Sequence, residues 1–454
     1  MASNADRPDA AHYSPPTEAP AIDSRARGGS GTMASPTGRL SGIGGLRNLR
    51  TFESFKVPAF RYFYGGMLSQ MAAMNMELIA RGLLIYQMTG SGTILGIMAM
   101  ANSLPMLVFS LFGGVLSDRV HKKTLMIFGQ AANAVLALGV AVAITTGVLS
   151  ADNPSGTWIL IVASLFKGSV QGLMLPARQA IIPELVRRDL IMNALALNNM
   201  GMNIFRILSP ALAGFAIAWW GYGSIYYLMT GLFVAATLFS IPLPKTPSAT
   251  FNKVRKGAMT DLVGGFKYIW QDRTIGLLLI FVLFAVLLSQ PYMMLLPIIT
   301  EDILHVGSRG MGILLSVSGL GSIGGSLLLA SLPDRWRGAM LLGTSFILGA
   351  ALLAFSFSAV WSLSLAAIVF VGIGQAGRIT LAGALLQSYV EDDYRGRVMS
   401  VYMMEFGLTG LSVMVAGMLS DSIGIQWSIG SMAIMLMVLC IAVGLLVPKL
   451  RKLH

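Results

Sequence analysis

Cysteine, histidine and charged residues are all scarce in this chain, and each scarcity excludes a class of protein. One cysteine, Cys440, leaves no partner for a disulfide and no cysteine-based metal cluster. Four scattered histidines lack the spacing of a metal site, so we expect neither a metal nor a cofactor. No Gly-x-x-x-x-Gly-Lys-Ser/Thr segment occurs, which argues against ATP hydrolysis by this chain. Because no nucleophile and base are arranged for catalysis either, we do not expect an enzyme.

The chain has few charged residues and many apolar ones. Charged residues make up 11% of the chain, whereas a soluble domain has about 25%. Hydrophobic residues reach 55% and form runs of about twenty residues, long enough to cross about 30 Å of hydrocarbon as a helix. We therefore predict an all-α membrane protein with twelve transmembrane helices in two pseudo-symmetric six-helix bundles. The expected spans are 58–87, 92–117, 123–148, 157–177, 193–219, 223–243, 274–299, 309–332, 339–358, 361–385, 397–420 and 426–448.

The chain divides at a long basic loop. We expect a six-helix bundle over 57–243, a cytoplasmic linker over 244–272, and a second bundle with a short basic tail over 273–454. Within the linker, the segment 261–270 has the pattern of an amphipathic surface helix. Residues 1–56 are rich in Pro, Ala, Ser, Gly and Arg and lack the apolar core of a signal peptide. We expect them to form a disordered cytosolic tail.

The basic residues alternate between loops. The net charge is +12, and one set of loops carries nearly all of it, whereas the other set carries only Arg309. Positive loops stay on the cytoplasmic side of a membrane. We therefore expect a multi-pass protein of the cell (inner or plasma) membrane with both termini in the cytoplasm. This orientation explains the charge without a nucleic-acid partner, and we expect none.

Two charged loops suggest an internal duplication. Gly114-Val-Leu-Ser-Asp-Arg-Val-His-Lys-Lys123 lies between two apolar runs, and Asp334-Arg-Trp-Arg-Gly338 lies between two others. Pro183-Glu-Leu-Val186 and Gln387-Ser-Tyr-Val390 hold matching places before the expected fifth and eleventh helices. Paired halves of this kind are typical of secondary transporters.

The first charged loop resembles the Gly-x-x-x-Asp-Arg-x-Gly-Arg-Arg loop of the major facilitator superfamily, with His121 in place of the second glycine. The matching residues are Gly114, Asp118, Arg119, Lys122 and Lys123. Four further segments resemble the branch that contains the enterobactin exporter and macrolide-efflux-like pumps: 86–91, 175–186, 206–214 and 395–401. The resemblance implies the major facilitator fold and secondary active export without a cofactor.

The resemblance also implies a conformational latch at the cytoplasmic side. Asp118 is expected to dock at the N-terminus of the eleventh helix, where a carboxylate is favourable, and to lock the outward-facing state. Arg119 and the pair Asp334 and Arg335 are expected to support it. The full set of gating residues is Gly114, Asp118, Arg119, Lys122, Lys123, Asp334 and Arg335.

Six charged residues fall inside the apolar spans, where a charge is unfavourable by about 2.5–3.5 kcal/mol unless it is paired or lines water. They are Glu77, Arg81, Lys167, Arg206, Arg378 and Glu405. Each either pairs to hold helices together or takes part in substrate binding or proton coupling. Glu77 and Arg81 share a helix face, and Lys167 and Arg206 either pair with Glu77 or attract an anionic substrate. Glu405 is a candidate proton acceptor beside Arg378.

Uncharged polar residues on the same spans either line a cavity or join helices. The candidates are Gln70, Asn75, Asn199, Asn203 and Gln290. The chain also has 29 methionines, which either pack as ordinary core residues or form a cavity that adapts to a bulky amphipathic substrate.

We therefore expect a monomeric, proton-coupled exporter of small amphipathic molecules, drug-like or siderophore-like, that works by alternating access in the lipid bilayer. Two alternatives remain open from the sequence. One is a lysophospholipid flippase, and the other is a transport-inactive membrane sensor or scaffold that uses the N-terminal tail to hold partners.

Overall fold

The computed structural model describes residues 50–150, 153, 156–244, 258–332 and 335–453, and these residues form helices without a β-strand. The first-half helices are η2 (Arg50–Lys56), α1 (Pro58–Thr89), α2 (Gly92–Arg119), α3 (Lys122–Thr145), α4 (Thr157–Leu185), η4 (Arg188–Leu190) and α5 (Ile191–Ser240). The second-half helices are α6 (Ala258–Gln271), α7 (Arg273–Ser289), α8 (Pro291–Met294), α9 (Leu296–Ile298), η5 (Ile299–Ile303), α10 (Gly307–Ser331), α11 (Arg337–Ser356), α12 (Trp361–Tyr389), α13 (Asp392–Met403), α14 (Glu405–Ile423), α15 (Ile425–Leu446) and α16 (Pro448–Arg451).

The described residues hold ten helical segments long and apolar enough to cross a membrane. One of them contains α5, which is divided at Gly221, where φ is 76°. Glycine adopts this left-handed conformation without the steric strain that a side chain brings, so α5 turns back and crosses twice. The 32-residue α1 adds a further span, which contains Arg61, Glu77 and Arg81. Together these helices give the twelve crossings predicted from the sequence.

The outer faces of the helices are apolar, as lipid contact requires. Large hydrophobic side chains are strongly exposed there, including Phe128 at 71%, Trp158 at 69% and Leu445 at 72%. A soluble protein seldom exposes apolar surface on this scale. The outer surface therefore supports a protein that spans a bilayer.

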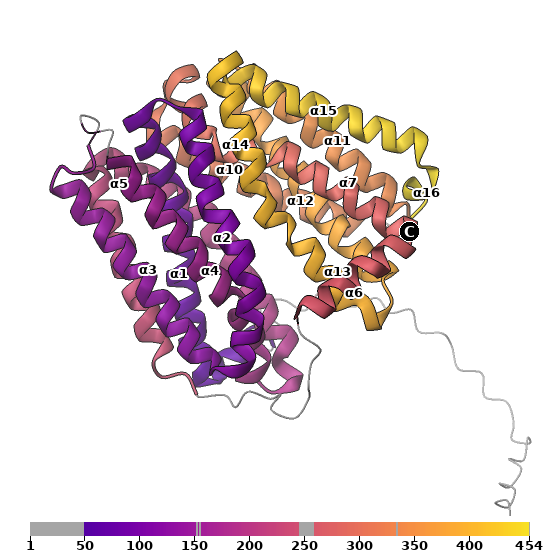
Figure 1. The fold of residues 1–454 in the computed structure, drawn as a ribbon, viewed down its shortest axis with the longest axis horizontal. Coiled ribbons are helices and arrows are strands. Elements are labelled where there is room, and N and C mark those ends of the chain that lie inside the picture. Colours follow the sequence, from indigo (N-terminus) through magenta and orange to yellow (C-terminus); the bar gives the residue numbers. More distant parts are fainter. Residues whose placement is uncertain (1–49, 151–152, 154–155, 245–257, 333–334, 454) are drawn as a thin grey trace, which may run out of the picture. The chain divides into compact units, whose positions relative to one another are not determined.

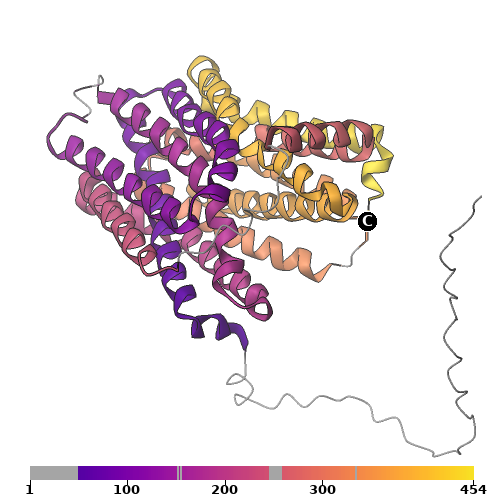
Figure 2. The same ribbon diagram turned by 60° about the horizontal axis from the view of Figure 1, so that its bottom comes forward.

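Two ends of the bundle can be distinguished by charge. We call the end at which α1 begins the basic end, because Arg187, Arg188 and Lys452 lie there. We call the opposite end, at which α1 finishes, the acidic end, because Glu301, Asp302 and Asp421 lie there. The helices α1 to α5 (indigo to magenta) gather on one side and α7 to α16 (red to yellow) on the other (Figure 1 and Figure 2).

The two sides meet where α2 packs on α14 and α5 packs on α10. Both contacts depend on glycine. A Cβ atom at Gly96 of α2 would lie 2.5 Å from the Cα atom of Met414, and one at Gly312 of α10 would lie 2.6 Å from the carbonyl oxygen of Pro210. Small residues let membrane helices approach this closely. Each contact lies in the part of the helix nearer the acidic end.

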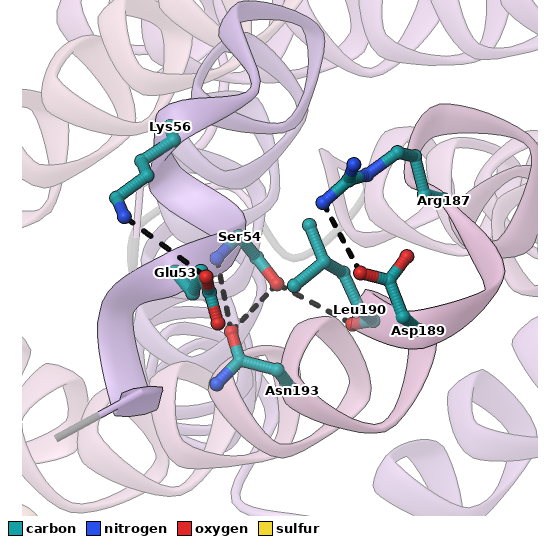
Figure 3. Close-up of polar contacts among 7 residues, drawn as sticks. All are labelled: Glu53, Ser54, Lys56, Arg187, Asp189, Leu190 and Asn193. Carbon is teal, nitrogen blue, oxygen red and sulfur yellow. Dashed lines mark hydrogen bonds and ion pairs between the residues drawn. The ribbon is translucent and has the colours of Figure 1, made fainter.

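The segment Arg50–Lys56, the last part of the expected tail, forms the helix η2 and is fastened to the basic end (Figure 3). The backbone N–H of Ser54 donates a 3.0 Å hydrogen bond to Oδ1 of Asn193, and the Ser54 hydroxyl donates one of 2.6 Å to the same atom. Ser54 is fully buried. Residues 1–49 lie outside the described part of the chain.

The predicted amphipathic helix at 261–270 is confirmed as part of α6. It packs against α13 through Tyr268 and Tyr394, whose rings stack with centroids 4.3 Å apart. Residues 245–257 of the predicted linker lie outside the described residues. The expected span at 397–420 is divided, because α13 ends at Met403 and α14 begins at Glu405.

Candidate functional site

A cavity of about 360 Å³ lies among α5, α10 and α12, at the middle depth of the bundle. Its position follows from the packing described above. Toward the acidic end, the Ser308 hydroxyl donates a 3.0 Å hydrogen bond to the Gly214 carbonyl, and Ser316 donates one of 2.5 Å to the Ile207 carbonyl. Past these contacts α5 and α10 separate and leave space. The lining residues are Asn203, Arg206, Ile207, Gly319, Ser322, Ile323, Ser326, Leu327, Gln375, Ala376, Ile379 and Thr380.

Two of the residues singled out from the sequence, Asn203 and Arg206, line this cavity with exposed side chains. A third, Gln290, reaches it through Gln375, which donates a 3.0 Å hydrogen bond from Nε2 to Oε1 of Gln290. This bond joins α12 to the end of α7. Because Asn203 and Arg206 lie on α5 and Gln375 lies on α12, the cavity is lined by both sides of the protein.

Three other predicted residues form an ion cluster inside the first half. Lys167 of α4 pairs with Glu77 of α1, and Nη1 of Arg81 lies 3.9 Å from the other oxygen of the same carboxylate. Arg81 also donates a 3.3 Å hydrogen bond to Ser164. The charged side chains are about nine-tenths buried, with 11–12% exposure. Two cations thus share one carboxylate, and the cluster keeps a net positive charge.

The ion cluster borders a small cavity of about 20 Å³. That volume suffices for a single water molecule, which needs about 10–15 Å³. Asn133 also lines the cavity, and its buried Oδ1 has no hydrogen-bond partner among the described residues. The ion cluster and Asn133 therefore share one small cavity, whose other lining residues are largely apolar.

The second half contains the pair Arg378 and Glu405, as electrostatic neighbours of each other. Arg378 of α12 is 2% exposed and Glu405 at the start of α14 is 5% exposed. Tyr402 is the hydrogen-bonding neighbour of Glu405. In the described part of the chain, Nε and Nη1 of Arg378 have no hydrogen-bond partner. A buried guanidinium with unused donors is unfavourable, and a rearrangement that supplies partners would stabilise it.

The remaining polar candidates do not line the large cavity. Gln70 is buried against α4, where its Nε2 lies 4.0 Å from Sδ of Met174. Asn75 donates a 2.8 Å hydrogen bond to the Met71 carbonyl of its own helix. Asn199 is exposed on α5.

The predicted latch is described only in part. Gly114, Asp118 and Arg119 lie in the last turns of α2, but their side chains, and Asp334 altogether, fall outside the described residues. Lys122 pairs with Glu184, which ties α3 to α4 within the first half. Lys123 is half-buried on α3 and Arg335 is exposed before α11. The docking of Asp118 therefore stays a prediction.

Contacts at the acidic end were missed in the sequence. Asp421, at the end of α14, accepts hydrogen bonds from the Ser91 hydroxyl at 2.7 Å and from the backbone N–H groups of Gly92 and Thr93 at 2.7 and 3.0 Å. The available signal was a Ser-Gly-Thr helix start with few basic residues in its loop. A carboxylate from elsewhere in the chain suits such a start.

Two further polar contacts close the acidic end. Tyr86 donates a hydrogen bond to Asp302, and Gln87 donates one of 3.4 Å to Glu301. Both join the end of α1 to η5. The segment 86–91, noted in the sequence only as a family-like motif, thus lies in the contact between the two sides.

The comparison with known families agrees with this architecture. The family described as "Transmembrane secretion effector", within the major facilitator superfamily, matches residues 50–453. The staphyloferrin A transporter of Staphylococcus aureus is 24% identical over 347 residues, which are 75% of this chain and 84% of that protein. The multidrug efflux pump Tap of Mycolicibacterium fortuitum is 23% identical over 390 residues, or 84% and 94%. The enterobactin exporter EntS of Citrobacter koseri is 25% identical over 348 residues, or 75% and 80%.

Solved structures share the fold at lower identity. The nucleoside transporter NupG has a TM-score of 0.67 and 14% identity, covering 85% of this chain and 98% of its own. A bacterial homologue of the human lysosomal transporter Spinster, inward-facing and unoccupied, has a TM-score of 0.66 and 12% identity, covering 86% and 98%. The chain belongs to the transmembrane secretion effector family of the major facilitator superfamily, and it is a multi-pass membrane transporter rather than an enzyme.

Proposed function

We propose that this transporter is a proton-coupled exporter of small amphipathic molecules that works by alternating access. The observation that carries the proposal is the cavity at middle depth, with its mixed apolar and polar lining, beneath helix contacts that close the acidic end. Names of relatives add support, because two of them are described as an efflux pump and an exporter.

Orientation follows from the basic end. Loops rich in Lys and Arg remain in the cytoplasm, so the basic end is cytoplasmic and the acidic end faces outward. The structure is then an inward-facing state, in which substrate enters the cavity from the cytoplasm. Export requires the acidic-end contacts of Asp421 and Tyr86 to break. The Asp118 latch at the other end then forms in their place.

Protons act at the buried carboxylates. Glu77 is shared by Lys167 and Arg81, so protonation of Glu77 removes the negative charge that holds these two cations together. Glu405 is the second candidate, because neutralising it frees Arg378 to change partners. Either event alters the helix packing of one half, which provides a route from proton binding to movement.

The test uses purified protein in vesicles and a panel of fluorescent drugs and siderophore-like compounds. An imposed pH gradient is expected to drive uptake into inside-out vesicles by the wild-type protein. Glu405→Gln and Glu77→Gln, tested separately, are expected to lose gradient-driven transport while at least one keeps substrate exchange without a gradient. Gradient-driven transport that survives in both variants rejects proton coupling at these carboxylates, and no transport by the wild type of any compound rejects the exporter.

A further inference from the structure

We propose that the transported molecule carries an anionic group, a carboxylate or a chemically similar oxyanion, which Arg206 binds in the large cavity. This inference rests on the proposed function and names its substrate class. It makes Arg206 the residue that determines which charge is accepted, with Asn203 and Thr380 as neutral donors beside it.

The charge of the cavity lining is the first argument. Among the described residues that line the cavity, Arg206 is the only charged one, and no carboxylate is present. A positive site inside a membrane protein attracts anions and repels cations, because the low-polarity surroundings strengthen both interactions. A cationic substrate in this space finds no counter-charge.

The lack of a partner for Arg206 is the second argument. Two of the other cations predicted to lie inside the spans have a carboxylate neighbour, Glu77 for Lys167 and Glu405 for Arg378. Arg206 is exposed into the cavity, and in the described part of the chain it has no salt bridge or hydrogen bond; its electrostatic neighbour is the hydroxyl of Tyr292. A guanidinium presents a planar fork of donors that matches a carboxylate. The ligand supplies the counter-charge that the protein omits.

The other residues that line the cavity indicate the chemical character of the rest of the ligand. Ile323, Leu327 and Ile379 give the cavity an apolar wall, whereas Asn203 and Thr380 are exposed and have no hydrogen-bond partner among the residues described. An inorganic anion makes no use of an apolar wall. The lining therefore fits an organic anion with a hydrophobic body, and the volume of about 360 Å³ accommodates one of several fused or linked rings.

The position of Arg206 also connects binding to movement. The next residue, Ile207, accepts the Ser316 hydrogen bond that joins α5 to α10, and a Cβ atom on Gly319 would lie 2.7 Å from the Ile207 side chain. An anion bound to Arg206 therefore touches the helix turn at which the two sides meet. The free energy of anion binding at Arg206 therefore acts on the packing of α5 against α10, which must change when the acidic end opens.

The experiment compares two dyes with the same three-ring frame. Fluorescein carries a free carboxylate and is an anion at neutral pH, whereas rhodamine 6G has that carboxyl group esterified and is a cation. Binding to the purified protein in detergent is measured by fluorescence anisotropy. We expect the wild type to prefer fluorescein, and Arg206→Gln to weaken fluorescein binding about tenfold or more, as loss of a charged hydrogen bond does. Arg206→Lys is expected to retain part of the affinity.

A matched control is Arg309→Gln, because Arg309 lies at the acidic end over the ring of Trp219, with 5.7 Å between its guanidinium carbon and the ring centroid. It should leave both affinities unchanged, and the thermal midpoint of each variant shows whether it folds. Rhodamine 6G preferred by the wild type, fluorescein binding that is absent, or fluorescein binding that survives in Arg206→Gln overturns the inference. Export of rhodamine 6G without fluorescein leaves the exporter standing while it rejects the anion site.

Discussion

The carboxylate of Asp421 at the end of α14 accepts a 2.7 Å hydrogen bond from the backbone N–H of Gly92, the first residue of α2. The two residues are 329 positions apart, so the bond joins the two halves of the chain. A helix start has unpaired N–H groups and a partial positive charge, and a carboxylate satisfies both. A carboxylate bound at a helix start is also expected at the basic end, where Asp118 is predicted to dock at the eleventh membrane span, the one expected at 397–420. Asp421 therefore helps to close the acidic end, and Asp118 is the carboxylate predicted to do the same at the basic end.

Asp421→Asn should favour opening of the acidic end. The charge contributes about 0.3–1 kcal/mol at a helix N-terminus, so its loss shifts the inward-to-outward ratio by up to about fivefold. Spin labels introduced at Thr146 and Ala359, both exposed near the acidic end, report the distance between the halves in a Cys440→Ala background. Asp189→Asn, which removes an exposed carboxylate paired with Arg187, is the control. Equal distance distributions in Asp421→Asn and wild type would contradict this role.

Gly96→Ala should loosen the packing of α2 against α14 through a steric clash alone. The added methyl lies 2.5 Å from the Met414 Cα atom, so the helices must separate, at about 1–3 kcal/mol. Gly139→Ala is the matched control, because a Cβ atom at Gly139 has no neighbour within 4 Å and alanine favours a helix by about 0.5–1 kcal/mol. The thermal midpoint in detergent should fall for the first variant and hold or rise for the second. A midpoint that does not fall at Gly96 rules out tight packing there.

Glu77→Gln should destabilise the first half strongly. It leaves Lys167 and Arg81 buried without a carboxylate, and breaking a buried pair in this way is unfavourable by about 3–5 kcal/mol. The double variant Glu77→Gln with Lys167→Met removes one of the two stranded cations and should recover much of the lost stability. The thermal midpoints of the single and double variants test whether Glu77 and Lys167 stabilise the protein as a pair. A double variant less stable than either single variant is incompatible with the pairing.

Ser54→Ala should release the helix η2 from the start of α5. The Ser54 hydroxyl donates to Oδ1 of Asn193, and losing a buried hydrogen bond lowers stability by about 0.5–1.5 kcal/mol (Figure 3). Limited proteolysis after Arg50 or Lys56 should become faster, since Lys56 is already largely exposed. Ser331→Ala, which removes an exposed hydroxyl bonded within its own helix, is the control. Unchanged cleavage in Ser54→Ala would mean that the hydrogen bonds do not fasten the segment.

Sequence patterns predict the helices well because each helix satisfies its backbone groups internally and must match the thickness of the membrane. The turn within α5 was predicted, since the apolar runs stop and restart on either side of Gly221. The break before Glu405 was not predicted, because α13 and α14 read as one apolar run once α13 has left its polar start. Local sequence reports hydrophobic length but not the bend that packing imposes.

The candidate site shows where sequence reasoning stops. Glu77 and Arg81 share a helix face by spacing alone, and their pairing could be anticipated. Gln70 had the same polarity as Asn203, yet it is buried against Met174 whereas Asn203 lines the cavity. The difference depends on which neighbouring helix each face meets. Spacing along one helix carries no information on that neighbour.

By itself, the sequence determined the apolar helices, the charge asymmetry between alternate loops and the likeness to a transporter superfamily, because these follow from local composition and motif. Only the tertiary structure decided which charges are paired, that Arg206 lines the large cavity, and which end of the bundle is closed by helix contacts. Lys167 meets Glu77 across 90 residues and Asp421 meets Gly92 across 329. Such contacts arise from helix packing, and the same packing places Arg206 in a cavity with no carboxylate among its described lining residues.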